Sequence, residues 1–77
     1  MSKRLTEAQQ RLVDDLRIYS GWLEFESPTG RWWFRYKDGR AVASLLVSRR
    51  TAEKLYDKGI IECSEKKHSY SNYRLVG

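Results

Sequence analysis

The sequence predicts a small single α+β domain spanning residues 1–77. Hydrophobic residues first recur with helical spacing over Leu5–Tyr19, and the pattern then changes to alternation with polar residues. Helical spacing returns after Val47, and a second alternating stretch begins at Ile60. The length is about half that of a typical domain, which leaves no room for a second one. We therefore expect an N-terminal helix, an antiparallel aromatic hairpin or meander, a second helix and a C-terminal hairpin.

The first helix carries its own start and stop signals. Thr6 followed by Gln9 predicts a capping box, in which each side chain accepts a hydrogen bond from the other residue's backbone N–H. Gly21 is predicted to supply the left-handed residue that ends the helix. Apolar side chains that share one helix face are expected to belong to the core: Leu5, Leu12, Leu16 and Tyr19.

An antiparallel hairpin is predicted around the Ser-Pro-Thr-Gly turn at residues 27–30. A register with Glu26 opposite Arg31 sorts the side chains of both strands onto two consistent faces. The expected core face carries Leu23, Phe25, Trp32, Phe34 and Tyr36. The expected outer face carries Trp22, Glu24, Glu26, Arg31, Trp33, Arg35 and Lys37. On that outer face we expect a salt bridge between Glu26 and Arg31 and a cation–π contact between Trp22 and Arg35.

The segment after this hairpin allows two interpretations. Asp38-Gly39 is the strongest short hairpin signal in the chain, and a two-residue turn there predicts a third strand. In that register Tyr36 faces Ala41, and small side chains lie opposite large aromatic ones. Alternatively, Ala41–Val47 forms a short helix, because its Ala and Leu residues favour helical structure.

A second helix is predicted to follow. Ser48 is expected to be its N-cap residue, because a serine hydroxyl accepts a hydrogen bond from an unpaired amide of the first turn. Gly59 is expected to end the helix in the left-handed conformation, with Ile60 closing a Schellman contact on Leu55.

Two strands are expected over residues 60–64 and 72–76, with an exposed polar loop over residues 65–71. The lone Cys63 alternates inward and is expected to be a small core residue in a reducing cytoplasm. One cysteine and one histidine (His68) exclude a disulfide framework and a multi-cysteine zinc site, so we expect no metal and no cofactor.

Val47–Ile61 resembles the recognition helix and following strand of winged helix-turn-helix DNA-binding domains, which often show a Val-Ser turn, a Thr-led helix and a Gly before a β-branched strand. The C-terminal hairpin resembles their wing, and Leu5–Tyr19 resembles their first helix. The resemblance covers residues 47–76 plus the first helix, and it implies a winged-helix-like domain that places one helix in a DNA major groove. A complete helix-turn-helix would need its positioning helix within Ala41–Leu46. If that segment is a strand, the fold is winged-helix-like only at its end.

The formal net charge of +5 is concentrated in one segment. Residues 31–50 hold six basic residues and one acidic residue, and such a local basic patch is typical of phosphate binding. DNA is therefore the predicted partner, and transcription regulation the predicted role. The predicted nucleic-acid-binding residues are Arg31, Trp33, Arg35, Lys37, Arg40, Arg49, Arg50, Thr51, Lys54, Lys66 and Lys67. Glu53 and Asp57 lie among the helix bases, a pattern equally typical of a solvated helix with internal salt bridges.

Exposed tryptophans indicate an alternative partner class. Trp22 and Trp33 point outward in the predicted hairpin, beside Arg35, and aromatic faces with arginine often bind proteins. The alternative function is a small phage-type or mobile-element-type inhibitor that blocks a host protein complex through these three residues.

Several other function classes are excluded by what the sequence lacks. It has no Ser/His/Asp spacing, no phosphate-binding glycine loop and no carboxylate pair in an identifiable pocket, so we expect neither an enzyme nor a small-molecule substrate. The longest apolar run, Leu45–Val47, falls far short of the roughly 18 residues of a membrane span. No apolar stretch follows Lys3 and Arg4, so we expect no secretory signal, no membrane partner and a cytoplasmic location.

Overall fold

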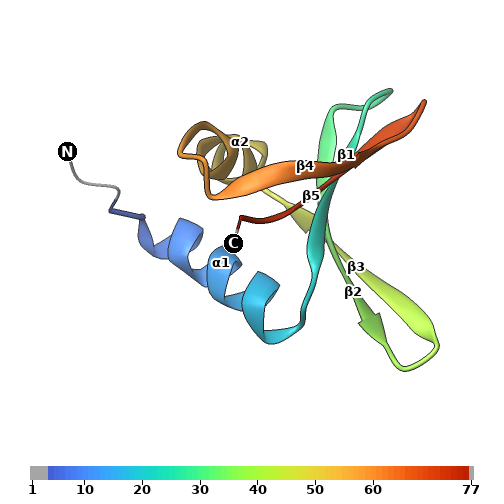
Figure 1. Ribbon diagram of the computed structural model, residues 1–77, viewed down its shortest axis with the longest axis horizontal. Coiled ribbons are helices and arrows are strands. Elements are labelled where there is room, and N and C mark those ends of the chain that lie inside the picture. Colours follow the sequence, from blue (N-terminus) through green and yellow to red (C-terminus); the bar gives the residue numbers. More distant parts are fainter. Residues whose placement is uncertain (1–3, 77) are drawn as a thin grey trace.

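The computed structural model describes residues 4–76, which form two helices and five strands (Figure 1). In chain order these are α1 (Glu7–Ile18), β1 (Trp22–Glu26), β2 (Arg31–Asp38), β3 (Ala41–Val47), α2 (Arg49–Asp57), β4 (Ile61–Lys66) and β5 (Tyr70–Leu75). All paired strands are antiparallel, and the order in the sheet is β3-β2-β1-β5-β4. Both helices pack on one face of this sheet, which confirms the predicted small α+β domain.

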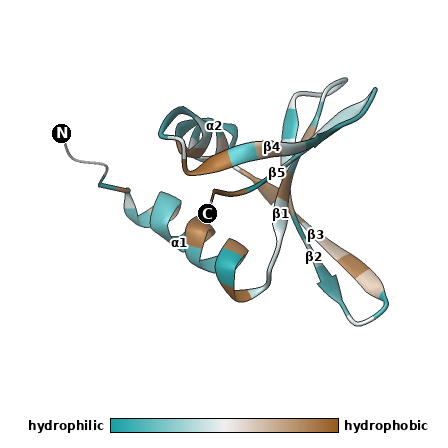
Figure 2. Cartoon of the chain, viewed as in Figure 1, coloured by the Kyte–Doolittle hydropathy of each residue, from teal (hydrophilic) through white to brown (hydrophobic). Residues whose placement is uncertain are grey.

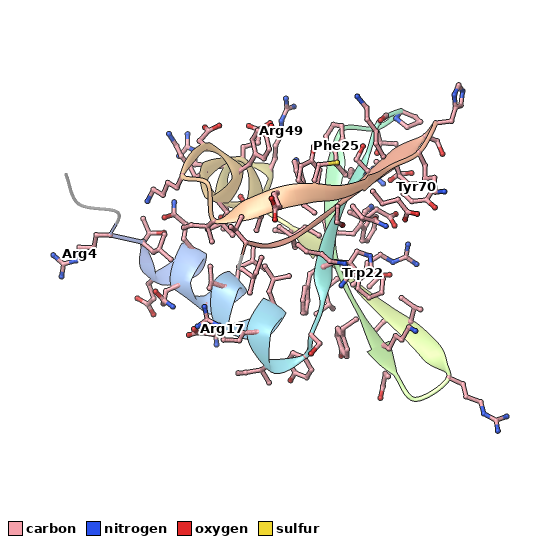
Figure 3. The ribbon with its side chains drawn as sticks, in the orientation of Figure 1. Arg4, Arg17, Trp22, Phe25, Arg49 and Tyr70 are labelled. Carbon is pink, nitrogen blue, oxygen red and sulfur yellow. The ribbon has the colours of Figure 1, made fainter. Side chains whose placement is uncertain are left out.

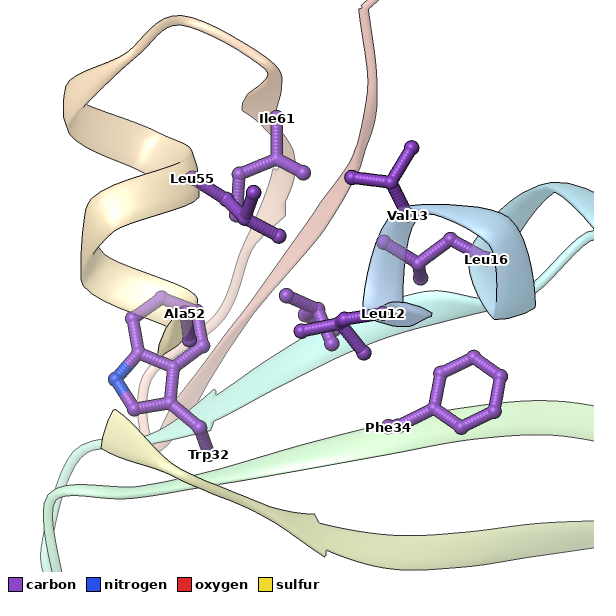
Figure 4. Packing of buried hydrophobic residues seen from close by; sticks show 9 residues of the cluster. Leu12, Val13, Leu16, Trp32, Phe34, Ala52, Leu55 and Ile61 are labelled. Atoms are coloured by element: carbon purple, nitrogen blue, oxygen red, sulfur yellow. The ribbon is translucent and has the colours of Figure 1, made fainter. Parts of the chain in front are cut away.

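The core lies between the sheet and the two helices (Figure 4). Its buried apolar cluster consists of Leu12, Val13, Leu16, Leu23, Trp32, Phe34, Ala52, Leu55 and Ile61. Leu23 of β1 and Leu55 of α2 are completely buried. Burying a leucine side chain of this kind contributes roughly 1.5–3 kcal/mol to stability. The sheet and α2 are therefore held together chiefly by hydrophobic packing.

The start of α1 is the capping box that the sequence predicts. The Gln9 backbone N–H donates to Thr6 Oγ1 at 3.2 Å, and the Thr6 backbone N–H donates to Gln9 Oε1 at 3.1 Å. Gln9 is also buried, and its side-chain oxygen accepts a second hydrogen bond, at 3.0 Å, from the Lys58 ammonium group beyond α2. The cap therefore ties the two helices to each other.

The end of α1 differs from the prediction. Ser20, with φ 51°, takes the left-handed position, and the Gly21 N–H donates to the Leu16 carbonyl at 3.0 Å. Gly21 is required for a different reason. A Cβ at that position would lie 2.6 Å from Phe34 Cε1 and 2.7 Å from the Arg35 carbonyl oxygen. Close packing of the chain against β2, and not a left-handed backbone, therefore excludes a side chain at Gly21.

The register of the β1–β2 hairpin is as predicted. The observed pairs are Trp22 with Arg35, Leu23 with Phe34, Glu24 with Trp33, Phe25 with Trp32, and Glu26 with Arg31. Alternating side chains therefore fall on the two expected faces, and Trp32 and Phe34 are buried.

The segment after this hairpin is strand β3, so the helical interpretation is wrong. The turn lies at residues 39–40, one position later than the predicted 38–39, and Tyr36 faces Ala43 two residues beyond its predicted partner. A shift of two residues keeps every side chain on its predicted face, because the strand period is two. Strand pairing wins over helix propensity because β3 satisfies the backbone groups along the free edge of β2. No helix therefore precedes α2 in a helix-turn-helix arrangement within residues 4–76.

Both ends of α2 lie where they were predicted, but only the C-terminal end forms the predicted hydrogen bonds. Ser48 is the N-cap residue, but its side chain makes no capping hydrogen bond. The other end is the predicted Schellman motif, with Gly59 at φ 73°. The Ile60 N–H donates to the Leu55 carbonyl, and the Gly59 N–H donates to the Tyr56 carbonyl, each at 3.0 Å.

Strands β4 and β5 are longer than predicted and leave only residues 67–69 between them. Ile61 faces Leu75 and Cys63 faces Tyr73, with an irregularity in the register after Cys63. The prediction that Cys63 is a core residue is wrong, because its side chain is exposed. β4 is an edge strand, so side chains beyond Ile61 lose the cover that central strands receive.

The two edges of the sheet have different chemistry. Edge strand β4 is interrupted by its register irregularity and carries charged side chains, including Glu62 and Glu65. Edge strand β3 has no charged residue, and Val42, Leu45 and Leu46 are 45%, 57% and 65% exposed. Figure 2 shows these hydrophobic positions extending along β3 towards the end of the β2–β3 hairpin. β3 therefore lacks the features that normally prevent an edge from pairing with another strand.

Candidate functional site

The sheet face opposite the helices is not covered by any other element of residues 4–76, and we call it the outer sheet face. Its principal side chains come from all five strands: Trp22, Glu24 and Glu26 of β1, Trp33 and Arg35 of β2, Leu46 of β3, Glu62 of β4, and Asn72 and Arg74 of β5. Figure 3 shows Trp22 on the side of the strands that points away from α1 and α2.

An ion pair occupies the centre of the outer sheet face. Arg35 Nη1 donates to Glu24 Oε1 at 2.7 Å, and the two side chains are 32% and 16% exposed. The short distance and partial shielding from water make this a charge-assisted hydrogen bond that neutralises the arginine locally. The predicted cation–π contact between Arg35 and Trp22 is therefore absent, because the guanidinium group is drawn to Glu24.

Glu26 holds the second indole of the outer sheet face. Trp33 Nε1 donates to Glu26 Oε1 at 3.2 Å, and the Thr29 hydroxyl donates to the same oxygen at 3.0 Å. Glu26 lies opposite Arg31 in the register but makes no salt bridge with it, so that predicted ion pair is wrong. The Trp33 ring is thus fixed in orientation while its side chain remains only partly buried.

Trp22 makes its cation–π contact with a residue of β5. The Arg74 guanidinium carbon lies over the Trp22 ring, 5.1 Å from its centroid. Arg74 is absent from the predicted site because the contact requires β5 to pair with β1, and those strands are far apart in the sequence. The local sequence gives one sign that Arg74 lies on the outer sheet face. Side chains alternate along residues 72–76, so Arg74 points to the face opposite the one that Tyr73 and Leu75 occupy.

A shallow depression of about 250 Å³ lies in the middle of the outer sheet face. Its lining residues are Glu24, Glu26, Trp33, Arg35 and Ser44. Two carboxylates and one arginine leave this depression without excess positive charge. It offers hydrogen-bond acceptors beside an indole ring, which suits a polar side chain of a partner better than a phosphate group.

The predicted helix residues lie in a different layer. Arg49, Arg50, Thr51 and Lys54 belong to α2, on the opposite side of the sheet from the outer sheet face. Arg49 Nε donates to Glu53 Oε2 at 2.9 Å, as expected for a helix with internal salt bridges. Arg50 and Lys54 are exposed and have no acidic partner within residues 4–76.

The remaining predicted residues lie at the two ends of the sheet. Arg40 occupies the turn of the β2–β3 hairpin, which projects from the body of the domain (Figure 1), and Lys37 lies close to that turn. Arg31, Lys66 and Lys67 lie at the opposite end, where the β1–β2 turn and the β4–β5 loop meet. Lys67 Nζ is 3.4 Å from Glu65 Oε2. The predicted nucleic-acid-binding residues therefore do not form one continuous surface.

Burial perturbs the ionisation of the Tyr73 side chain near the core. It raises the pKa of Tyr73 above the ordinary value of 10.0, and the nearby Cys63 and Tyr56 raise it further. Within residues 4–76, no three His, Cys, Asp or Glu side chains gather closely enough to hold a metal ion. Neither helix of that region has the length and apolar character needed to cross a membrane.

Comparison with known proteins gives no match. No protein-family model matches the chain, and no characterised protein or solved structure is significantly similar to it. The function is therefore inferred from the residues and their geometry.

Proposed function

We propose that this chain is a non-enzymatic binding module whose outer sheet face docks on a partner protein. The observation that carries the proposal is an uncovered sheet face on which two partly exposed indole rings flank a neutralised arginine. Trp and Arg are the residues most enriched among those that dominate binding energy at protein interfaces.

The charge balance of this face favours protein over nucleic acid. A nucleic-acid groove combines aromatic rings with basic side chains that are free to contact phosphates. On the outer sheet face, Arg35 is paired with Glu24, and the Glu26 carboxylate lies against Trp33. Carboxylates in these positions repel a phosphate backbone, whereas they provide hydrogen-bond acceptors for a protein partner.

The same contacts prepare the face for binding. Trp33 is held by Glu26, and Trp22 is covered by Arg74, so both rings are already oriented in the free protein. Side chains that are fixed before association lose less conformational entropy on binding, an effect of about 0.5–1.5 kcal/mol for each flexible side chain. The face is thus suited to rigid docking.

A capture experiment tests the proposal. The intact chain is immobilised on a solid support and incubated with nuclease-treated host extract. We expect it to capture a partner protein, and we expect Trp22→Ala or Trp33→Ala to abolish this binding or to weaken it at least tenfold. Ile18→Ala serves as the control because Ile18 is 72% exposed at the end of α1, on the other side of the sheet. Circular dichroism establishes that each variant is folded. Equal capture by the Trp33→Ala variant and the unmodified chain would refute the role of the outer sheet face.

DNA binding through α2 is the second candidate. The specific observation is that Arg50 and Lys54 are exposed and unpaired within the described part of the chain, while the net charge is +5. Fluorescence anisotropy with a short duplex at low and high salt measures this directly. If α2 contacts phosphates, Arg50→Ala weakens binding and lowers the salt slope by about 1, whereas Arg17→Ala on α1 leaves both unchanged. Absence of duplex binding at low salt would eliminate this candidate.

A further inference from the structure

A second concave feature lies on the helix side of the sheet, away from the outer sheet face. It is a cleft of about 270 Å³ between α2 and strands β1, β2 and β5. Its lining residues are Phe25, Trp32, Glu53, Tyr56, Asp57 and Tyr73, and we call it the aromatic cleft. Figure 3 shows Phe25 between α2 and the strand ends, and Figure 4 shows the Trp32 indole beside Ala52 of α2.

The sheet side of the aromatic cleft is a row of rings. The Phe25 and Trp32 centroids are 5.0 Å apart, and the Trp32 and Tyr73 centroids are 5.1 Å apart. Tyr56 of α2 meets Tyr73 edge to face, with centroids 5.5 Å apart and planes at 85°. Trp32 is only 5% exposed, whereas Tyr56 is 53% exposed. The row therefore runs from the core to the surface without a break.

The helix side of the aromatic cleft carries negative charge. Glu53 and Asp57 are one helical turn apart on α2 and lie on the same side as Tyr56. One Glu53 oxygen accepts a hydrogen bond from Arg49, while the Asp57 carboxylate has no hydrogen bond or ion pair within residues 4–76. An unpaired carboxylate thus faces aromatic rings across the cleft, on a protein that is otherwise positively charged.

We propose that the aromatic cleft binds a trimethylammonium group, with the cation lying between the aromatic row and Asp57. The faces of Trp, Tyr and Phe attract cations, and quaternary ammonium groups are the ligands that aromatic enclosures most often recognise. A primary ammonium group fits less well because it is strongly hydrated and needs several hydrogen-bond acceptors. The volume lies below the range of drug-sized pockets, which limits the ligand to a small head group or one side chain.

NMR of the intact 15N-labelled chain tests this proposal. Choline is titrated through the millimolar range, and the neutral isostere 3,3-dimethylbutan-1-ol is titrated in parallel. The indole N–H signal of Trp32 is expected to shift with choline alone, while those of Trp22 and Trp33 on the outer sheet face remain in place. No shift at Trp32, or equal shifts with the neutral isostere, would overturn the proposal. Because the outer sheet face supplies separate signals, failure here leaves the proposed protein-binding function unaffected.

Two variants separate the charge from the fold. Asp57→Asn keeps the shape of the side chain and removes its charge, so choline binding is expected to weaken several-fold. Asp38→Asn makes the same chemical change at the exposed end of β2, outside the aromatic cleft, and should leave binding unchanged. Equal binding by the unmodified chain and the Asp57→Asn variant would refute the role of the carboxylate.

A final comparison identifies the source of the trimethylammonium group. A short peptide containing trimethyllysine is titrated beside choline and beside the same peptide with unmodified lysine. Tighter binding of the methylated peptide than of choline identifies a protein side chain as the ligand, whereas tighter binding of choline identifies a free small molecule. Equal binding of the methylated and unmodified peptides would contradict the proposal, because selectivity for the weakly hydrated cation would then be absent.

Discussion

Gly21→Ala should destabilise the fold strongly, although alanine is ordinarily a mild replacement. The added Cβ would lie 2.6 Å from Phe34 Cε1 and 2.7 Å from the Arg35 carbonyl oxygen, against an ordinary carbon contact of about 3.5–4.0 Å. One neighbour must therefore move by roughly 1 Å. Phe34 is buried, and the Arg35 carbonyl belongs to the backbone of β2, so neither can yield easily.

The expected cost follows from this crowding. Overpacking of a well-packed site costs about 1–3 kcal/mol, and a chain of this length has a total stability of roughly 4–12 kcal/mol. Ser20→Gly is the matched variant, because Ser20 holds the left-handed conformation, with φ 51°. Glycine at this position relieves roughly 1–2 kcal/mol of backbone strain in the folded chain and raises the conformational entropy of the unfolded chain by an equivalent of about 0.5–1 kcal/mol. The Ser20→Gly variant should therefore be slightly more stable than the unmodified chain.

Urea denaturation followed by far-UV circular dichroism and tryptophan fluorescence measures both variants. The midpoint should fall for Gly21→Ala and rise or stay level for Ser20→Gly, with the m-value unchanged. A loss below about 0.5 kcal/mol for Gly21→Ala would refute the packing argument, and a clear destabilisation by Ser20→Gly would refute the strain assigned to Ser20.

Three further outcomes are expected. Leu55→Ala should cost about 2–5 kcal/mol in urea denaturation because Leu55 is completely buried, and a smaller cost would indicate that the core relaxes around the cavity. The uncharged edge of β3 should give concentration-dependent self-association in analytical ultracentrifugation, which Val42→Lys and Leu46→Lys abolish; a strictly monomeric parent chain would contradict this. Burial raises the pKa of Tyr73 in the folded chain above its ordinary value of 10.0, so the Tyr73 hydroxyl loses its proton at lower pH in the unfolded chain than in the folded one. The stability that this residue contributes is therefore fully present below pH 10.0 and declines as the pH rises through the pKa of Tyr73 in the folded chain. Tyr73→Phe should remove this part of the alkaline decline, and an unchanged profile would exclude Tyr73 as its source.

Local patterns in the sequence were sufficient for the elements whose partners are near in the chain. The capping box of Thr6 and Gln9 and the Schellman motif at Gly59 involve residues no more than five positions apart in the chain. The β1–β2 register is also local, because a four-residue turn joins strands whose alternation has a period of two. Alternation along the two strands likewise places Trp22 and Trp33 on the outer sheet face.

Contacts between distant segments decided the rest. Residues 41–47 have mixed propensity, and only the free edge of β2 makes them a strand. Glu24 and Glu26 each have several possible hydrogen-bond partners on β2. In the folded chain, Arg35 donates to Glu24 and Trp33 donates to Glu26.

The local sequence pattern does not predict that β1 pairs with β5, because about 50 residues separate Trp22 from Arg74 along the chain. The same pairing brings Tyr73 beside Trp32 and so completes the aromatic cleft under α2. Alternation along a strand determines which face a side chain occupies. Which distant side chain it meets there depends on strand order and helix placement, and these are set by burial of the whole core.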